Sequence, residues 1–453
     1  MRKTVVIAAI VGFIFAAHTR LYASESTVDI DALKEQIKKE LRAERPWQDE
    51  IASWKIDIHG FASQGFLCSD KYNFLAPNSD GGSFSYNEIG INFGKDLTDK
   101  LRIGVQFLAR DLGDIYNDEP EIDWAYGDYH WQDWLGIRAG ILKVPLGLYN
   151  ETRDVDMLRT SVLLPGGVYH EPYREFMMGL IGVGVYGAIP LGPIGGMDYT
   201  VEAGTINLAD DGGIAKQYED DVRQIGMGPF MLSDFEISDF DFEEMYVGSL
   251  VWRSPWGLRL GGTFNRASFT TNGRDENYLA GGVSSGYACN VEMDTTEIRN
   301  YTLSAEYTWE DLVLAAEYWN NTFWTKSTFD FTVAPPPVPI VSVQQSTKRM
   351  IEGYYFSASY RFTQWFELGS YYSVYYPFGS QSQAEGLNNP TIPGNKDYTK
   401  DWTLSTRFDF NEYWAFKVEG HRMNGTAYPL FRENDSFPDK RWWLLAAKIT
   451  FSF

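Results

Sequence analysis

The end of the chain alternates apolar and polar residues without a break up to its final residue. The apolar positions share one side of an extended strand and are Trp443, Leu445, Ala447, Ile449, Phe451 and Phe453. Ten residues of strand advance about 33 Å, which a tilt near 45° reduces to about 24 Å of membrane depth. That depth matches the apolar band of a transmembrane barrel. The pattern therefore predicts a strand with one face in lipid.

Strands are the elements that can carry this chain across a membrane beyond its first residues. No later apolar run approaches the roughly 20 residues that a helix needs to span a bilayer, and the mean hydropathy is −0.30. A barrel faces only every second residue outward, so a near-polar average is expected of it. The net charge of −22 argues against a nucleic-acid partner, which would need a basic surface.

The first 23 residues have the pattern of a secretory signal peptide. Arg2 and Lys3 precede an apolar stretch from Val5 to Ala17, and Ala23 is a small residue at a plausible cleavage position. The apolar core is about 13 residues, too short to anchor the chain as a membrane helix. We therefore expect residues 1–23 to be removed.

Residues 24–50 are predicted to form a short periplasmic helix. Ile30, Leu33, Ile37 and Leu41 recur at helical spacing, and Pro46 ends the pattern. The helix either helps subunits to trimerise or lies beneath the barrel mouth.

From residue 51 to residue 453 the period changes to two, which predicts a closed antiparallel β-barrel of about 16 strands, an all-β fold. The connections alternate between short ones, such as 131–134, and long ones, such as 208–243. Short turns on one side and long loops on the other are typical of bacterial outer-membrane barrels. A soluble propeller is the competing interpretation, but it would show a regular repeat of about 40 residues.

The third long loop, about 144–179, is predicted to fold into the lumen and narrow it. Opposed charges at a constriction replace an ion's hydration shell and create a transverse field that sorts polar solutes. A solvated outer loop with incidental ion pairs is the alternative. The candidate constriction residues are Glu151, Arg153, Asp154, Asp156, Arg159, Arg174 and Glu175.

Strand parity also predicts which charged residues face the interior, because charge facing lipid costs about 2 to 4 kcal/mol near the midplane. Structural ion pairs that stiffen the wall are a second interpretation of the same residues. Tyrosines at 354–355 and in the run 371–376 either stack on sugars or pack in an interfacial girdle. The predicted lumen-facing residues are Arg102, Gln106, Arg110, Arg138, Arg259, Arg361, Arg407, Lys417 and Lys448.

The segment from Leu135 to Gly147, the charged loop after it and the aromatic terminus resemble the Gram-negative porin superfamily, and more loosely the phosphate-selective porins O and P. The resemblance implies a 16-stranded trimeric pore whose third loop enters the channel. Phe451 and Phe453 are similar to the terminal signal that the barrel-assembly machinery reads in outer-membrane proteins. Phosphate selectivity is not carried over, because no ladder of arginines is matched.

The expected function is passive diffusion of small hydrophilic solutes or ions across the outer membrane, with lipid and lipopolysaccharide around the barrel. Two alternatives remain: a sheath around a periplasmic multihaem cytochrome, which needs 20 or more strands, and a surface adhesin with a blocked lumen. We expect no catalysis, cofactor or metal, since no GxSxG, CxxCH or metal motif occurs. Calcium binding by 208–243 and pairing of Cys68 with Cys289 stay open.

Overall fold

The computed structural model describes residues 55–116, 118–224, 229–333, 340–379, 396–434 and 436–453. The chain divides into two units, 1–56 and 57–453, and the second holds the barrel. The predicted signal peptide (1–23) and periplasmic helix (24–50) lie outside the described residues. No helix in the described ranges is long and apolar enough to cross a membrane.

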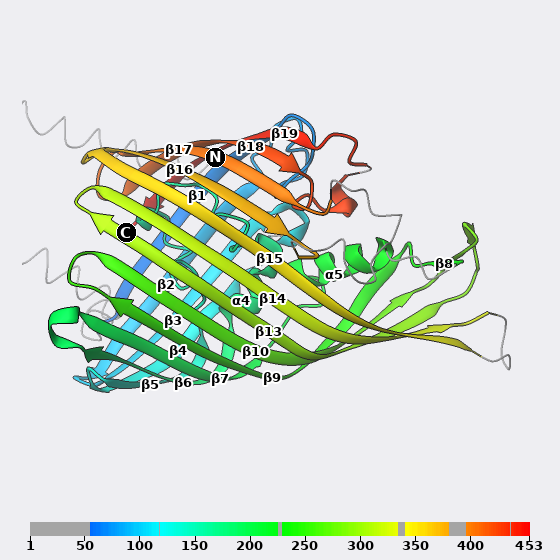
Figure 1. Cartoon of the computed structure of the whole chain (residues 1–453), viewed down its shortest axis with the longest axis horizontal. Helices are drawn as coiled ribbons and strands as arrows, with labels where there is room; N and C mark the ends of the chain where they lie inside the picture. Colours follow the sequence, from blue (N-terminus) through cyan, green and yellow to red (C-terminus); the bar gives the residue numbers. More distant parts are fainter. Residues whose placement is uncertain (1–54, 117, 225–228, 334–339, 380–395, 435) are drawn as a thin grey trace, which may run out of the picture. The chain divides into compact units, whose positions relative to one another are not determined.

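Sixteen antiparallel strands of the described chain close into one barrel, which confirms the predicted fold class. Each strand pairs with its neighbours along the chain, and the first strand closes the wall against the last (Figure 1). Every backbone group of a closed wall has a partner within the sheet, which lipid requires. The strands are β1 (Asp57–Ser69), β2 (Tyr86–Thr98), β3 (Leu101–Leu112), β4 (Glu121–Gln132), β5 (Leu135–Leu142), β6 (Leu180–Pro190), β7 (Gly196–Ile206), β9 (Phe235–Arg253), β10 (Leu258–Asp275), β13 (Cys289–Trp309), β14 (Leu312–Phe331), β15 (Val341–Thr363), β16 (Phe366–Tyr376), β17 (Thr399–Asp409), β18 (Trp414–Gly425) and β19 (Arg441–Ser452).

The last strand shows the alternation that organises the whole wall. Trp443 and Leu445 are 57% and 46% exposed, whereas Trp442 and Leu444, which alternate with them along the strand, are each 1% exposed. Large apolar side chains are exposed on every barrel strand except β16, and a chain in water would not present so many. The apolar outer face identifies the wall as a β-barrel that spans a membrane.

Exposed aromatic side chains gather at the short turns. Trp131 and Trp134 flank the β4–β5 turn, and Trp309 and Trp365 lie at the β13–β14 and β15–β16 turns. Aromatic residues favour the membrane–water interface, where one end of the ring is apolar and the other is wet. The short turns therefore mark the periplasmic rim of the apolar belt.

Five neighbouring strands, β9, β10, β13, β14 and β15, extend far beyond the rest of the wall. They contain 18 to 23 residues each, against 8 to 13 in the other barrel strands. At about 3.3 Å per residue the surplus projects roughly 20 to 30 Å past the membrane (Figure 1). A small sheet of β8 (Phe230–Met231), β11 (Leu279–Ala280) and β12 (Val283–Ser284) and an apolar core around Phe235, Tyr278 and Phe331 complete this extracellular lobe.

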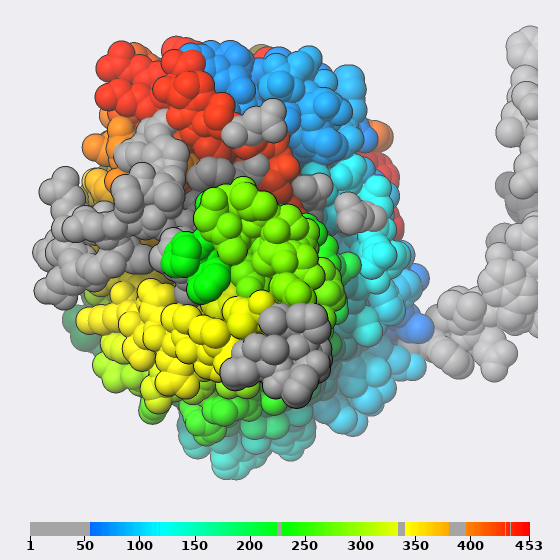
Figure 2. Space-filling model, turned by 90° about the vertical axis from the view of Figure 1, so that its right-hand side faces the viewer, coloured from blue at the N-terminus to red at the C-terminus, as the bar shows by residue number. Residues whose placement is uncertain are grey.

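The long loops meet at the extracellular end of the barrel. The hydroxyl of Tyr72, in the first loop, donates a hydrogen bond of 2.6 Å to the carbonyl of Asp439 in the last loop. The rings of Tyr72 and Phe437 lie 5.3 Å apart, and Figure 2 shows these blue and red segments adjoining at this end. The loop 143–179 carries η2 (Asp156–Leu158), η3 (Glu171–Tyr173) and α4 (Arg174–Met178), and the next long loop carries α5 (Gly213–Gln224).

A charge placed on the lipid face should destabilise the barrel in proportion to its depth. Leu404, an exposed outward residue of β17, lies between Trp402 and Phe408 in the belt. We expect Leu404→Arg to lower the free energy of unfolding by about 1 to 3 kcal/mol in denaturant titrations in lipid vesicles, because Leu404 lies within the belt but nearer its extracellular rim than its midplane. The control Phe410→Arg, at the periplasmic rim, should lower it by about 0 to 1 kcal/mol. Equal losses in the two variants would contradict the assignment of Leu404 to lipid.

Candidate channel interior

Ion pairs line the periplasmic end of the interior. Each arginine of this ring shares its strand face with buried residues further along the strand, as Arg138 does with Leu142, so it points inward. Charges inside the wall are tolerated because water and opposite charges solvate them. The pairs are Arg102–Asp57 at 3.1 Å, Arg138–Asp128 at 3.0 Å, Arg253–Asp198 at 2.6 Å, Arg259–Glu306 at 2.8 Å and Arg361–Asp409 at 2.9 Å.

Asp156 fastens the third loop to the wall at β18 and β19. Its carboxylate lies 3.1 Å from the Lys448 ammonium and 3.4 Å from that of Lys417, and it accepts a 2.7 Å hydrogen bond from Thr450. Arg159, three residues along the same loop, lies 2.8 Å from the same carboxylate. Burial raises the pKa of Asp156, but the three cations outweigh it and hold the pKa well below its usual range. A buried charge with this many partners fixes the loop at one point.

Two wall carboxylates hold the backbone of the same loop. Glu419 of β18 accepts the N–H groups of Val162 and Leu163, both at 2.8 Å. Glu317 of β14 accepts the N–H of Leu148 at 2.8 Å and the hydroxyl of Tyr355 at 2.7 Å. Because β14 and β18 lie across the barrel from β5 and β6, between which the loop runs, these bonds stretch the loop across the lumen.

A second group of ion pairs closes the loop on itself and on β3 and β4. Arg153 lies 2.8 Å from Glu171, and Arg110 of β3 reaches the same carboxylate at 3.5 Å. Asp154 contacts Lys143 and Arg174. Burial raises the pKa of Glu171, but Arg153, Arg110 and Arg174 together lower it to about 2. All of these charges stay ionised near neutral pH.

The candidate constriction residues divide into four groups by position. Arg153, Asp154, Asp156 and Arg174 are buried in ion pairs that lie within the loop or join it to the wall. Glu175 accepts the N–H of Gly213 at the start of α5, and Glu151 is exposed. Arg159 lines a cavity inside the barrel. A role of this set in sorting ions stays a prediction.

The nine residues predicted to face the lumen all lie on the inner side of their strands. Gln106, Arg110, Arg407, Lys417 and Lys448 are buried there. The other four belong to the periplasmic ring of ion pairs and are Arg102, Arg138, Arg259 and Arg361.

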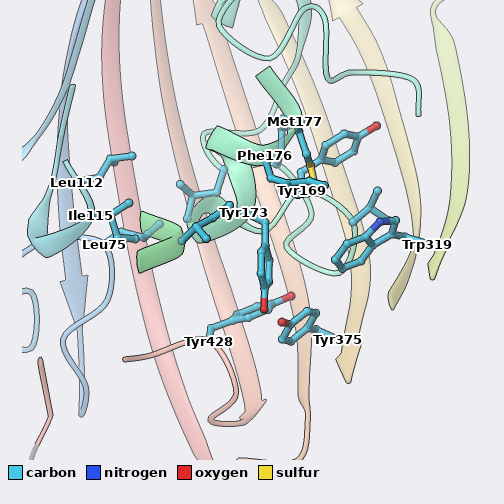
Figure 3. Packing of buried hydrophobic residues seen from close by; sticks show 14 of the residues in the cluster. Leu75, Leu112, Ile115, Tyr169, Tyr173, Phe176, Met177, Trp319, Tyr375 and Tyr428 are labelled. Carbon is cyan, nitrogen blue, oxygen red and sulfur yellow. The ribbon is translucent and has the colours of Figure 1, made fainter. Parts of the chain in front are cut away.

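Apolar packing fills the extracellular half of the interior. One cluster joins side chains of the third loop, such as Tyr173 and Phe176, to inward residues of opposite walls, such as Leu112 and Trp319 (Figure 3). Several inward tyrosines point to this cluster as well, among them Tyr375 (Figure 3). The sequence did not predict this cluster, because an inward apolar residue near a strand end has the same local pattern as an outward one.

Two cavities lie on either side of this packing. The larger, of 370 Å³, is lined by polar groups such as Arg159, Arg407 and Glu367 and reaches Thr308 at the periplasmic end of β13. The smaller, of 30 Å³, lies toward the extracellular loops. Leu164 and Tyr371 line both cavities. The two cavities therefore meet at these side chains. Tyr371 was not assigned to the interior from the sequence, although its parity with Gly369 and Ser373 on β16 is a signal that could have placed it there.

No group of three His, Cys, Asp or Glu side chains in the described part of the chain is arranged to hold a metal ion. Cys68 and Cys289 are both free thiols in the structure. Some acidic residues of the segment 208–243 form ion pairs, as Asp221 does with Arg349.

His170 joins the third loop to the last loop within the apolar packing. Its ring stacks on Tyr375 at 4.8 Å and on Tyr428 at 5.3 Å, and burial lowers its pKa from 6.5 to about 3. Below pH 6.5 the unfolded chain binds a proton at His170, whereas the folded chain stays neutral there until the pH approaches 3. The free energy of unfolding therefore decreases as the pH falls from 6.5 toward 3.

Acid should therefore loosen this junction. Between pH 7 and 4.5 the loss in free energy of unfolding due to His170 should reach up to about 2.7 kcal/mol. His170→Phe retains a stacking ring without a titratable group, so its denaturation midpoint should fall less over the same interval. Parallel losses in wild type and variant would show that His170 does not carry the effect.

No protein-family model and no curated protein sequence matches the chain. Among solved structures, Salmonella typhi OmpF in complex with daunomycin matches 88% of this chain and 97% of its own at 12% identity, with a TM-score of 0.51. The outer-membrane channel DcaP of Acinetobacter baumannii has a TM-score of 0.48 at 10% identity over 88% and 97% of the two chains. The anion-selective porin of Comamonas acidovorans has a TM-score of 0.47 at 11% identity, and the match covers 88% of this chain and 99% of the porin. The chain has the fold of the Gram-negative outer-membrane porins.

Proposed function

We propose that this protein is an outer-membrane channel for passive diffusion of small hydrophilic solutes or ions. The observation that carries the proposal is the polar cavity of 370 Å³ inside the barrel, between the third loop and the inner face of β13–β17. Hydroxyl groups of Ser357, Ser359 and Ser405 line it beside charged groups. Such a lining replaces the hydrogen bonds that a small polar solute gives up to water.

The narrowest part of the proposed path lies where Leu164 of the third loop meets Tyr371 of β16. Polar solutes gain no hydrogen bond from the Leu164 side chain, so a neck of this kind restricts passage by size and by the cost of losing water. The charged groups lie next to the neck on the periplasmic side, with Arg159 closest in sequence to Leu164. Size filtering and charge sorting would then occur in sequence.

Cation and anion preference depends on which charges are exposed to the cavity. Arg159, Arg361 and Arg407 line it together with Glu306 and Glu367. Asp409 lies 2.8 Å from Arg407 and 2.9 Å from Arg361, so much of this charge is neutralised locally. We infer weak selectivity, far from what the net charge of −22 for the whole chain suggests.

A cytochrome sheath fits this interior poorly. Sixteen strands in the described chain enclose a lumen that the third loop already crosses, and a separate protein would need a wider barrel. Trimer formation and use of the barrel-assembly machinery stay predictions. No catalytic role is proposed.

Surface binding is a second candidate, favoured by the extracellular lobe. The lobe has its own apolar core around Phe235 and Phe331, so it is a built structure rather than a set of loops. An adhesin would need the lobe but no open lumen. Lack of conductance together with binding to a surface would favour this candidate over the channel.

Planar-bilayer recordings of the purified full-length protein test the channel and its neck. Stepwise conductance is expected for wild type. Tyr371→Ala removes the ring shared by the two cavities and should raise single-channel conductance on the order of twofold. The control Tyr372→Ala alters the next residue of the same strand, whose ring packs against Trp402 on the outer face, and should leave conductance unchanged. No steps at all in wild type would remove the channel proposal.

Replacement of Arg159 tests charge sorting at the cavity. Arg159→Ala removes one positive charge from the lining of the cavity. The zero-current potential in a salt gradient should therefore shift toward cation preference, because cations meet less repulsion beside the ion path. Arg266→Ala removes an arginine from the outer surface, where it pairs with Glu297 at 3.0 Å, and should cause no shift. An unchanged potential in Arg159→Ala would exclude this arginine from ion sorting.

A further inference from the structure

Two arginines stand apart from all the others in the described part of the chain. Every other described arginine lies within 4.0 Å of a carboxylate, whereas Arg422 of β18 and Arg441 of β19 form no ion pair there. Both side chains are exposed. The guanidinium of Arg422 lies 5.8 Å from the centre of the Trp443 ring, a contact that leaves its charge without a counter-charge. Two neighbouring arginines without a carboxylate indicate an anionic partner outside the chain.

The register of β17, β18 and β19 places these arginines on the lipid-facing side. Arg422 lies opposite Trp402 on one side and Trp443 on the other, and both tryptophans are outward and exposed. One pair further toward the extracellular loops, Asn424 lies opposite Lys400 and Arg441. Positive charge therefore begins where the apolar belt ends on the extracellular side.

The nearby acids are already engaged. Asp439 lies 2.7 Å from Lys71, and the carboxylate of Asp70 accepts the backbone N–H of Trp443 at 2.7 Å. Lys400 contacts the ring of Tyr398 and has no carboxylate partner in the described ranges. The local excess of positive charge is not cancelled by the chain.

The outer face directly below Arg422 carries no side chain at its centre. The next row toward the membrane centre is Leu404, Gly420 and Leu445, in register across the three strands. A Cβ added at Gly420 would meet no atom within 4 Å, so the glycine leaves open space between two exposed leucines. The acyl chain of a lipid can lie in this space with its polar head group at the level of Arg422.

We propose that this surface binds a phosphorylated, acylated glycolipid of the outer leaflet, the class to which lipopolysaccharide belongs. Its phosphate accepts hydrogen bonds from the guanidinium groups of Arg422 and Arg441, which suit phosphate oxygens in geometry and charge. One acyl chain lies over Gly420 between Leu404 and Leu445. Trp402 and Trp443 flank the head at the depth where indole rings prefer to lie. The proposal depends on the outer-membrane location and does not require the channel to conduct.

The test uses purified full-length protein and bis-phosphorylated lipid A, with retention measured by native mass spectrometry. Wild type should retain lipid A, and Arg422→Gln/Arg441→Gln should bind it about tenfold more weakly, because two charges near the surface are lost. The control Lys326→Gln/Arg274→Gln removes two positive charges from the extracellular lobe and should bind as wild type. Equal binding by the two double variants would overturn the proposal.

Further measurements distinguish binding of the phosphate head group from binding of the acyl chain of the lipid. Dephosphorylated lipid A should bind wild type about as weakly as lipid A binds the arginine variant, and inorganic phosphate should not compete at millimolar concentration. Gly420→Phe fills the space between Leu404 and Leu445 without changing charge and should also reduce retention of lipid A. Competition by inorganic phosphate, or full retention by Gly420→Phe, would overturn the assignment of an acylated ligand.

Folding and oligomeric state are read from the same spectra. Arg422→Lys/Arg441→Lys keeps the charge and should retain more lipid A than the glutamine variant, which separates binding from any failure to fold. A change of oligomeric state in Arg422→Gln/Arg441→Gln, with lipid A binding unchanged, would identify the surface as a contact between copies of the chain and overturn the lipid proposal.

Discussion

Closure of the hydrogen-bonded wall is the constraint on which the rest of this structure depends. Lipid offers no partner to a free N–H or C=O group, so the strands must pair all the way round. Once closed, the wall forces alternate side chains into opposite environments. Outward residues such as Leu404 then become a membrane belt, and inward residues such as Glu419 become anchors for whatever enters the lumen.

What enters the lumen is the third loop, and its position is set by charge as much as by packing. Asp156 and Glu419 bind it to one side of the wall, and Glu317 binds it to another. Buried charges of this kind are costly to leave unpaired, so each one specifies where the loop lies. The apolar cluster above and the ionic ring below divide the interior into a dense extracellular half and a polar periplasmic half.

The fold could be predicted from the sequence because its signal is local. Parity in the last strand and the alternation of short and long connections require no knowledge of which strands pair. The site was harder, because its contacts join distant residues: Asp156 with Lys448, and Leu164 with Tyr371. The sequence shows the charge of Asp156 but not that it lies buried against β19. Parity assigned Arg407 and Lys417 to the interior, yet it could not distinguish a solvated charge from one that binds loop carbonyl groups.

The central claim is that the third loop lies inside the barrel against the wall opposite its origin, and a designed disulfide tests it most directly. A Cβ added at Gly369 of β16 would lie 3.1 Å from the Cβ of Thr160 in the loop, close to the distance within a disulfide of about 3.8 Å. In a protein with Cys68 and Cys289 replaced by serine, Thr160→Cys/Gly369→Cys should form this bond in the membrane under mild oxidation. Mass spectrometry of a tryptic digest should show the linked peptides. Two free thiols that both react with a maleimide would contradict the account.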